Sequence, residues 1–220
     1  MDMNLLSILK RPIFWILDLL DLHSLYSLRR GGPLLEDGWF RSYREQTSID
    51  ATGSPLPWLT YPAIEFLLRR IKPEMSVFEY GSGGSTRWWA SRVRDVVSVE
   101  HDRAWFEKVG KDQQAHVKAY QIDLVYGGEY SRKIRDFENC FDVVIVDGRD
   151  RVNCLKNCLQ ALKPSGVVIL DNSDRSEYSE GVEFLLVNGF RRLEFVGPCP
   201  IVNYKSETSI FYRKENVFGI

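Results

Sequence analysis

Five acidic residues stand at the ends of predicted β-strands, and their positions indicate where this chain could do chemistry. They are Glu79, Glu100, Asp123, Asp147 and Asp171. The carboxyl ends of parallel strands lie along one edge of an open α/β sheet, so we expect these carboxylates to converge on a single rim. Such a rim repels a phosphate-rich cofactor and attracts a cationic ligand or a divalent metal ion.

A glycine-rich turn lies between the first two of these acids. The apolar run Ser76–Tyr80 predicts a buried strand, the turn at residues 81–84 follows it, and residues 85–93 predict a helix. A second strand at residues 96–99 then stops at Glu100. This is the layout of a nucleotide-binding βαβ unit, in which the terminal carboxylate accepts hydrogen bonds from two ribose hydroxyls. An ordinary tight turn between a strand and a helix is the alternative.

Glu79 distinguishes this turn from a dinucleotide site. It precedes the first glycine by two residues, where it would repel a pyrophosphate and favour an ammonium or sulfonium group. Thr86 also replaces the third glycine of the dinucleotide fingerprint. The stretch therefore resembles motif I of the class I S-adenosylmethionine-dependent methyltransferases, an acid followed by GxGxG. Glu79, Gly81 and Gly83 match that motif, with Ser85 in place of the last glycine.

The resemblance implies a Rossmann-like, doubly wound α/β fold with a seven-stranded sheet, mostly parallel, and S-adenosyl-L-methionine as cofactor. Residues 191–196 and 208–213 predict the last two strands, with no room for a crossover helix between them, so we expect an antiparallel C-terminal strand. Residues 37–213 as a whole look like a bacterial group of methyltransferase-like proteins. The cofactor would be bound by Glu79, Tyr80, Gly81, Ser82, Gly83, Ser85, Glu100, His101, Asp123 and Asp147.

A second resemblance concerns the ends of the fourth and fifth strands. The segments FDVVIVDG and SGVVILDN are similar to the catechol-type O-methyltransferases. The resemblance implies that Asp147, Asp171 and Asn172 hold a divalent cation such as Mg²⁺. The lysine that this family carries three positions after the first acid is replaced by Asp150. The alternative is that Asp147 contacts cofactor or substrate directly and that Asp171 and Asn172 begin a turn.

The reaction expected from these resemblances is methyl transfer to a small molecule, at oxygen. A hydroxyl acceptor needs a base, for which the candidates are Asp147 and Asp150. Candidate substrate contacts are Trp58 and Tyr61, in an irregular segment, and Arg149 and Arg175, which cluster with Arg151 beside the rim. The arginines suit an anionic substrate, although they could equally offset the carboxylates of the rim. A cofactor-binding scaffold without catalysis and an NAD-dependent dehydrogenase are the alternative functions.

Composition limits the partners. The formal net charge of −1 leaves no electrostatic footprint for nucleic acid. The four cysteines show no CxxC pair and no zinc spacing, which favours a reducing compartment, the cytoplasm. With 220 residues the chain is long enough for one domain with a substantial core and a short extension.

The N-terminus predicts an amphipathic helix. Residues 5–28 are rich in apolar side chains, but charged residues interrupt them, so no span of about 20 apolar residues exists. We therefore expect an N-terminal helical extension at residues 1–36 and a methyltransferase-like domain at residues 37–220. The extension would cap the domain or pair with a second copy in a homodimer, and contact with a membrane surface is the alternative.

Overall fold

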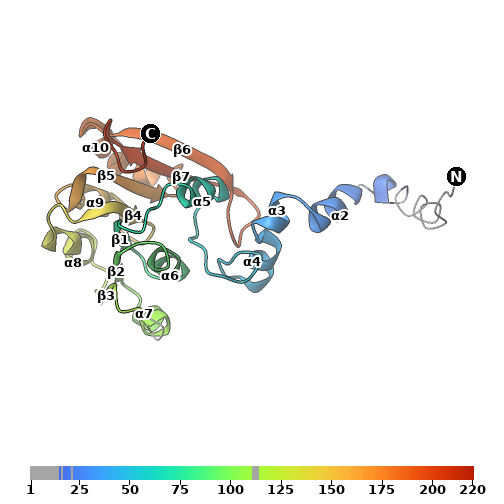
Figure 1. Cartoon of the computed structure of the whole chain (residues 1–220), viewed down its shortest axis with the longest axis horizontal. Helices are drawn as coiled ribbons and strands as arrows, with labels where there is room; N and C mark the ends of the chain where they lie inside the picture. The colour runs from blue at the N-terminus through green and yellow to red at the C-terminus, as the bar shows by residue number, and fades with distance from the viewer. Residues whose placement is uncertain (1–14, 16, 21, 111–113) are drawn as a thin grey trace.

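A seven-stranded sheet forms the centre of the computed structural model, which describes residues 15, 17–20, 22–110 and 114–220. Its strand order is β3-β2-β1-β4-β5-β7-β6, from the bottom to the top of Figure 1. The strands are β1 (Ser76–Tyr80), β2 (Asp95–Glu100), β3 (Val117–Gln121), β4 (Phe141–Val146), β5 (Leu162–Asp171), β6 (Arg191–Pro198) and β7 (Lys205–Tyr212). Strands β1 to β5 pair in parallel, and β7 is antiparallel to both of its neighbours. The predicted fold class is confirmed.

Short helices connect and cover these strands. They are α2 (His23–Arg30), α3 (Pro33–Glu36), α4 (Trp39–Glu45), α5 (Tyr61–Leu68), α6 (Gly84–Ala90), α7 (Arg103–Gly110), α8 (Glu129–Arg132), α9 (Arg151–Asn157) and α10 (Ser179–Val187). Two 3₁₀ turns, η1 (Lys133–Asp136) and η2 (Ser176–Tyr178), adjoin α8 and α10. The irregular segment expected at residues 38–61 therefore begins with a helix, α4.

The core lies on both faces of the sheet because side chains alternate along each strand. In β4, Val144 and Val146 face a cluster that includes residues of α8, α9 and α10. Val143 and Ile145 face a second cluster, built on α5 and α6. Both clusters bury aromatic rings, Tyr80 and Tyr130 in the first and Trp88 and Trp89 in the second. The continuous apolar run of β4 is explained by this burial on two sides.

One predicted boundary is wrong. The sequence pattern predicts a helix over residues 152–162, but α9 ends at Asn157 and β5 begins at Leu162. Leu162 pairs with Phe141 across an irregularity in the β4–β5 register. The Lys163 ammonium also lies 2.7 Å from the Asp142 carboxylate on the neighbouring strand. Contacts with β4 thus extend β5 toward its N-terminal end, and a helix prediction from periodicity does not take such contacts into account.

The N-terminal segment is attached to the domain through α4. The predicted helix at residues 5–28 lies partly outside the described residues, and its described part, with α2, projects from the domain (Figure 1). Helix α2 has no buried residue, whereas the Trp39 indole of α4 donates a hydrogen bond of 2.7 Å to the carbonyl of Val202. Within the described ranges, no helix is long and apolar enough to cross a membrane. The boundary near residue 37 and the role of the extension stay predictions.

We predict that truncating a core leucine of α5 destabilises the protein far more than truncating its neighbour. Leu67 is 0% exposed and Leu68 is 46% exposed. Leu67→Ala should lower the free energy of unfolding by about 2–5 kcal/mol, because it leaves a cavity under the sheet. Leu68→Ala should change it by no more than about 0.5 kcal/mol. Urea denaturation of both variants measures the difference, and equal losses would contradict this packing of α5.

Candidate functional site

The ends of β1, β2 and β4 bring three of the predicted acidic residues together. Strand β1 lies between β2 and β4 and pairs in parallel with both, so Glu79, Glu100 and Asp147 stand at the same edge of the sheet. The glycine turn after β1 joins them: the N–H of Ser82 donates a hydrogen bond of 2.8 Å to Oε2 of Glu100. The expected acidic rim is therefore present around this turn.

Glycine is required at the first position of the turn. Gly81 has a φ of +97°, and a Cβ atom there would lie 3.2 Å from Cα of Gly148. The chain after β1 therefore passes close to the chain after β4. Gly148 is confined in turn, because a Cβ atom on it would lie 2.1 Å from the Tyr130 hydroxyl. The loops after β1 and β4 can therefore approach each other this closely because both positions are glycine.

Glu79 is a buried carboxyl group with one oxygen left without a partner. Its residue is 1% exposed. Oε2 accepts a hydrogen bond of 2.6 Å from the Thr86 hydroxyl, whereas Oε1 makes no hydrogen bond within the described part of the chain. Burial raises the pKa of Glu79 to about 7, against the opposing effect of the hydroxyl groups of Ser85 and Thr86. Such an oxygen favours a ligand that brings a cationic donor.

Glu100 is held by backbone N–H groups. Besides Ser82, the N–H groups of His101 and Asp102 each donate a hydrogen bond of 2.8 Å to its Oε1. The His101 Nδ1 atom lies 2.9 Å from the same oxygen, and its ring packs edge-on against Tyr130. Glu100 thus fixes the glycine turn, and of the four acceptor positions of its carboxylate about one remains for a ligand hydroxyl.

A cavity of about 320 Å³ opens beside the glycine turn. Turn residues 82–85 form one wall, Asp147 lies on another, and residues 46–48 with Trp58 close it from the segment before α5. Trp105 of α7 also lines it, and its indole N–H donates a hydrogen bond of 2.5 Å to the Ser82 carbonyl. The cavity is therefore shared by the predicted cofactor turn, the candidate base and one candidate substrate residue.

The predicted metal ligands surround a guanidinium group. Arg151 lies between the ends of β4 and β5, with Nη2 3.2 Å from Oδ1 of Asp147 and Nη1 3.2 Å from Oδ1 of Asn172. In the described ranges, no group of three or more His, Cys, Asp or Glu side chains could hold a metal ion. The residues present do not fit Mg²⁺, so the expected Mg²⁺ site is not supported. The guanidinium of Arg151 occupies the position expected for the metal ion.

The carboxyl groups of this edge differ in their hydrogen bonds. The Asp147 side chain is 25% exposed, and burial raises its pKa, with Arg151 opposing the rise. Burial also raises the pKa of Asp171, and the nearby Asp147 adds to the rise. Asp171 accepts a hydrogen bond of 2.7 Å from the Thr208 hydroxyl of β7. Of these two carboxyl groups, only that of Asp147 belongs to a residue that lines the cavity.

Other predicted site residues have structural contacts or lie away from this cavity. Both carboxylate oxygens of Asp150 accept hydrogen bonds, 2.7 Å from the Gly127 N–H and 2.6 Å from the Asn153 amide. The Tyr80 hydroxyl donates to the Ser131 carbonyl in the core. Tyr61 is buried in the core cluster of α5 and α6. The remaining three, Asp123, Arg149 and Arg175, are exposed.

Sequence reasoning missed the roles of Thr86 and Trp105, and it did not predict where Arg151 lies. Thr86 was read only as a missing glycine, yet its hydroxyl holds Glu79. Trp105 covers the glycine turn from the next helix, and Arg151 occupies the predicted metal position. Thr86 lies seven residues after Glu79, so its position on the first helical turn was a usable signal. No local pattern indicated Trp105. The clustering of Arg149, Arg151 and Arg175 indicated that arginines could offset the carboxylates of the rim, and Arg151 contacts Asp147 in this way.

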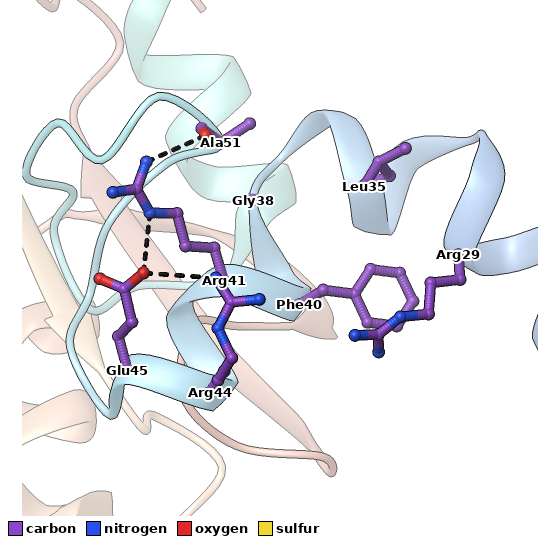
Figure 2. Close-up of a pocket in the computed structure, with 8 residues that line it drawn as sticks. All are labelled: Arg29, Leu35, Gly38, Phe40, Arg41, Arg44, Glu45 and Ala51. Atoms are coloured by element: carbon purple, nitrogen blue, oxygen red, sulfur yellow. Dashed lines mark hydrogen bonds and ion pairs between the residues drawn. The ribbon is translucent and has the colours of Figure 1, made fainter.

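A second hollow, of about 420 Å³, lies on α3, α4 and the end of α2. Figure 2 shows its arginines: the Arg41 guanidinium points to Glu45 and to the carbonyl of Ala51. Arg44 also approaches Glu45, and Arg29 lies over the ring of Phe40. These charges are already partnered, and the hollow contains none of the acidic strand ends. We therefore place the candidate site at the glycine turn.

Comparison with known families supports the sequence prediction. A family profile described as a methyltransferase domain matches residues 78–173. That range runs from β1 through the end of β5, and so includes the glycine turn and all five acidic strand ends. A search of curated proteins found no significant match.

Solved structures share the fold. Precorrin 8w decarboxylase from Methanobacterium thermoautotrophicum superposes with a TM-score of 0.54 at 16% identity, over 77% of this chain and 97% of that one. Spermidine synthase from Thermotoga maritima superposes with a TM-score of 0.53 at 16% identity, over 70% of this chain and 61% of that one. The tRNA (m1A58) methyltransferase from Aquifex aeolicus superposes with a TM-score of 0.52 at 15% identity, over 71% of this chain and 70% of that one. This chain thus spans about six tenths of the length of the spermidine synthase. At these identities the likeness shows the fold alone.

We predict that Glu79→Gln stabilises the protein at alkaline pH. The carboxyl group binds its proton more tightly in the folded chain, with a pKa of about 7 against 4.5. Stability from this group is therefore complete below pH 4.5 and is lost as the pH rises through 7. At pH 8 the variant should be more stable by about 1–3 kcal/mol, and the difference should shrink toward pH 5.

Thermal or urea unfolding across this pH range measures that difference. Glu65→Gln is the control, because the Glu65 side chain on α5 is 59% exposed. It should show no comparable pH-dependent gain. A Glu79→Gln variant less stable than the wild type at pH 8 would contradict the buried, raised-pKa carboxyl group.

Proposed function

We propose that this chain, in which residues 78–173 match a methyltransferase-domain profile, belongs to the class I S-adenosylmethionine-dependent methyltransferase superfamily and transfers a methyl group to an oxygen atom of a small-molecule acceptor. Oε1 of Glu79, beside the glycine turn, has no hydrogen-bond partner among the residues that the structure describes, and this observation carries the cofactor side of the proposal. The acceptor would lie at the Asp147 end of the same cavity.

The residues of the turn fit the methyl donor. S-adenosylmethionine, when bound, supplies a methyl group on a sulfonium, which is a good leaving group. Glu79 offers a buried acceptor for a cationic donor, and Glu100 offers its remaining acceptor position to a ribose hydroxyl. Glycines 83 and 84 line the cavity with backbone alone. Trp105 and Trp58 shield the cavity from water with aromatic surface.

Asp147 is the proposed base. Its carboxylate takes the proton of the acceptor hydroxyl while the acceptor oxygen bonds to the methyl carbon. A bound methyl donor would supply the methyl group and a sulfur leaving group, and Asp147 would hold the proton that the acceptor hydroxyl releases. The raised pKa of Asp147 brings its proton affinity closer to that of a base working near neutral pH. The chain's main contribution is alignment of the acceptor within the cavity.

The strand order favours a methyltransferase over a dehydrogenase. A dinucleotide-binding sheet has the order 3-2-1-4-5-6, whereas here an antiparallel β7 is inserted between β5 and β6. Glu79 and the absent third glycine add to that preference. A cofactor-binding scaffold without catalysis would share all these features, so activity has to be measured.

The size and charge of the site favour a small acceptor. The cavity has a volume of about 320 Å³, and the formal net charge of −1 gives the chain no overall positive charge to attract nucleic acid. The candidate substrate contacts remaining are Trp58, which lines the cavity, and the exposed Arg149 and Arg175, which suit an anionic group. RNA belongs in the acceptor screen as a contrasting class.

We predict that the protein binds S-adenosylhomocysteine in isothermal titration calorimetry and that it does not bind NAD. Glu100→Gln should weaken S-adenosylhomocysteine about tenfold or more, because it removes a charged acceptor and loosens the glycine turn. Glu107→Gln is the control, since that side chain on α7 is 64% exposed. Binding of NAD alone would refute the proposed function.

We predict that Asp147→Asn lowers methyl transfer by about 10²–10⁴-fold while S-adenosylhomocysteine affinity changes little. The assay is formation of S-adenosylhomocysteine with an acceptor found by screening phenols, hydroxy acids and RNA. Asp136→Asn, at a side chain that is 60% exposed, is the control. Full activity in Asp147→Asn would exclude it as the base, and methylation of RNA alone would exclude a small acceptor.

A further inference from the structure

The ends of β4 and β5 carry their own cation, and we propose that the guanidinium of Arg151 replaces a divalent metal ion at this site. The proposal has two consequences: the wild-type protein binds no metal there, and methyl transfer is independent of metal. The second consequence rests on the proposed function, and the first does not.

Arg151 is bonded as fully as a guanidinium can be. Its Nε donates to the Gly148 carbonyl at 3.0 Å. Nη1 donates to the Asp171 carbonyl at 2.5 Å and to Asn172 Oδ1 at 3.2 Å. Nη2 donates to the carbonyl and Oδ1 of Asp147, at 3.0 and 3.2 Å. These five bonds match the five N–H donors of the side chain.

The oxygen atoms around Arg151 are those that a hard cation would use. They include carbonyl, carboxylate and amide oxygens from the ends of two adjacent strands, the donor types that bind Mg²⁺ or Ca²⁺. Oδ1 of Asp147 and Oδ1 of Asn172 each accept a hydrogen bond from Arg151, so a metal ion would have to compete with the guanidinium for both oxygens. A divalent ion would also meet the repulsion of the guanidinium. The metal and the arginine therefore exclude each other.

The start of α9 holds the side chain in place. Arg151 is 8% exposed, and its guanidinium lies 5.1 Å from the centre of the Tyr178 ring. The preceding residue, Asp150, has a φ of +51° and bonds the Gly127 N–H and Asn153. These bonds fix the turn from which α9 begins, so Arg151 has one well-defined position.

Arg151 is a positioning residue in this proposal. Asp147 lines the cavity, and its contact with Arg151 fixes one of its carboxylate oxygens. The guanidinium thus orients the proposed base and balances its charge, two tasks that a metal ion performs through coordination. A lysine could supply the charge but not the forked contact with both strand ends.

Binding of Mn²⁺, followed by electron paramagnetic resonance, tests the first consequence. The wild type should show no stoichiometric site at millimolar Mn²⁺. Arg151→Ala should gain one site with at least tenfold higher affinity, and Arg151→Ala combined with Asp147→Asn should lose it. Arg132→Ala, at an exposed arginine of α8, should behave as the wild type. A stoichiometric wild-type site that Asp147→Asn abolishes would overturn the proposal, and so would a folded Arg151→Ala variant without any gain.

Methyl-transfer assays test the second consequence. EDTA should leave the wild-type rate within about twofold, and loss of activity on EDTA treatment would overturn metal independence. Arg151→Met should lower kcat at least tenfold with little change in S-adenosylhomocysteine affinity, and Arg151→Lys should recover part of the loss. A merely structural arginine would lower both together. Failure to bind S-adenosylhomocysteine would refute the proposed function, but it would not alter the Mn²⁺ result.

Discussion

The burial of several carboxyl groups at one edge of the sheet is the constraint on which this site depends. Glu79, Glu100 and Asp171 are almost fully buried, and Asp147 lies beside them. Buried carboxylates lose hydration and repel one another, so each needs a donor. The chain supplies backbone N–H groups to Glu100, hydroxyl groups to Glu79 and Asp171, and the guanidinium of Arg151 to Asp147.

The hydrogen-bond donors divide the site into two parts, one between β4 and β5 and the other at the glycine turn. On the β5 side of β4, Arg151 neutralises the strand ends and completes their hydrogen bonds. At the glycine turn, Oε1 of Glu79 still lacks a partner in the described chain. The proposed cationic cofactor would therefore find an acceptor at the turn, whereas the position between β4 and β5 already holds a cation. Under the two proposals, the same sheet edge would bind the sulfonium donor at the turn and exclude a metal ion between β4 and β5.

The local part of the site follows from short-range sequence patterns. A strand, a glycine turn and a second strand ending in Glu100 span residues 76–100, and their spacing indicated that Glu79 and Glu100 would meet. The antiparallel C-terminal hairpin was predictable as well, because the short connection between its strands leaves no room for a crossover helix. Asp123 shows the limit of such reasoning: it ends a strand, yet its side chain is exposed.

The sequence by itself determined which strands end in acids and where the backbone turns closely enough to admit a ligand. Only the tertiary structure decided what neutralises those acids. Trp105 reaches the glycine turn from α7, and Arg151 spans from the start of α9 to Asn172, 21 residues further along the chain. Which side chain fills the space between two strand ends depends on the packing of several elements at once. A family motif could suggest a metal there, but packing placed a guanidinium.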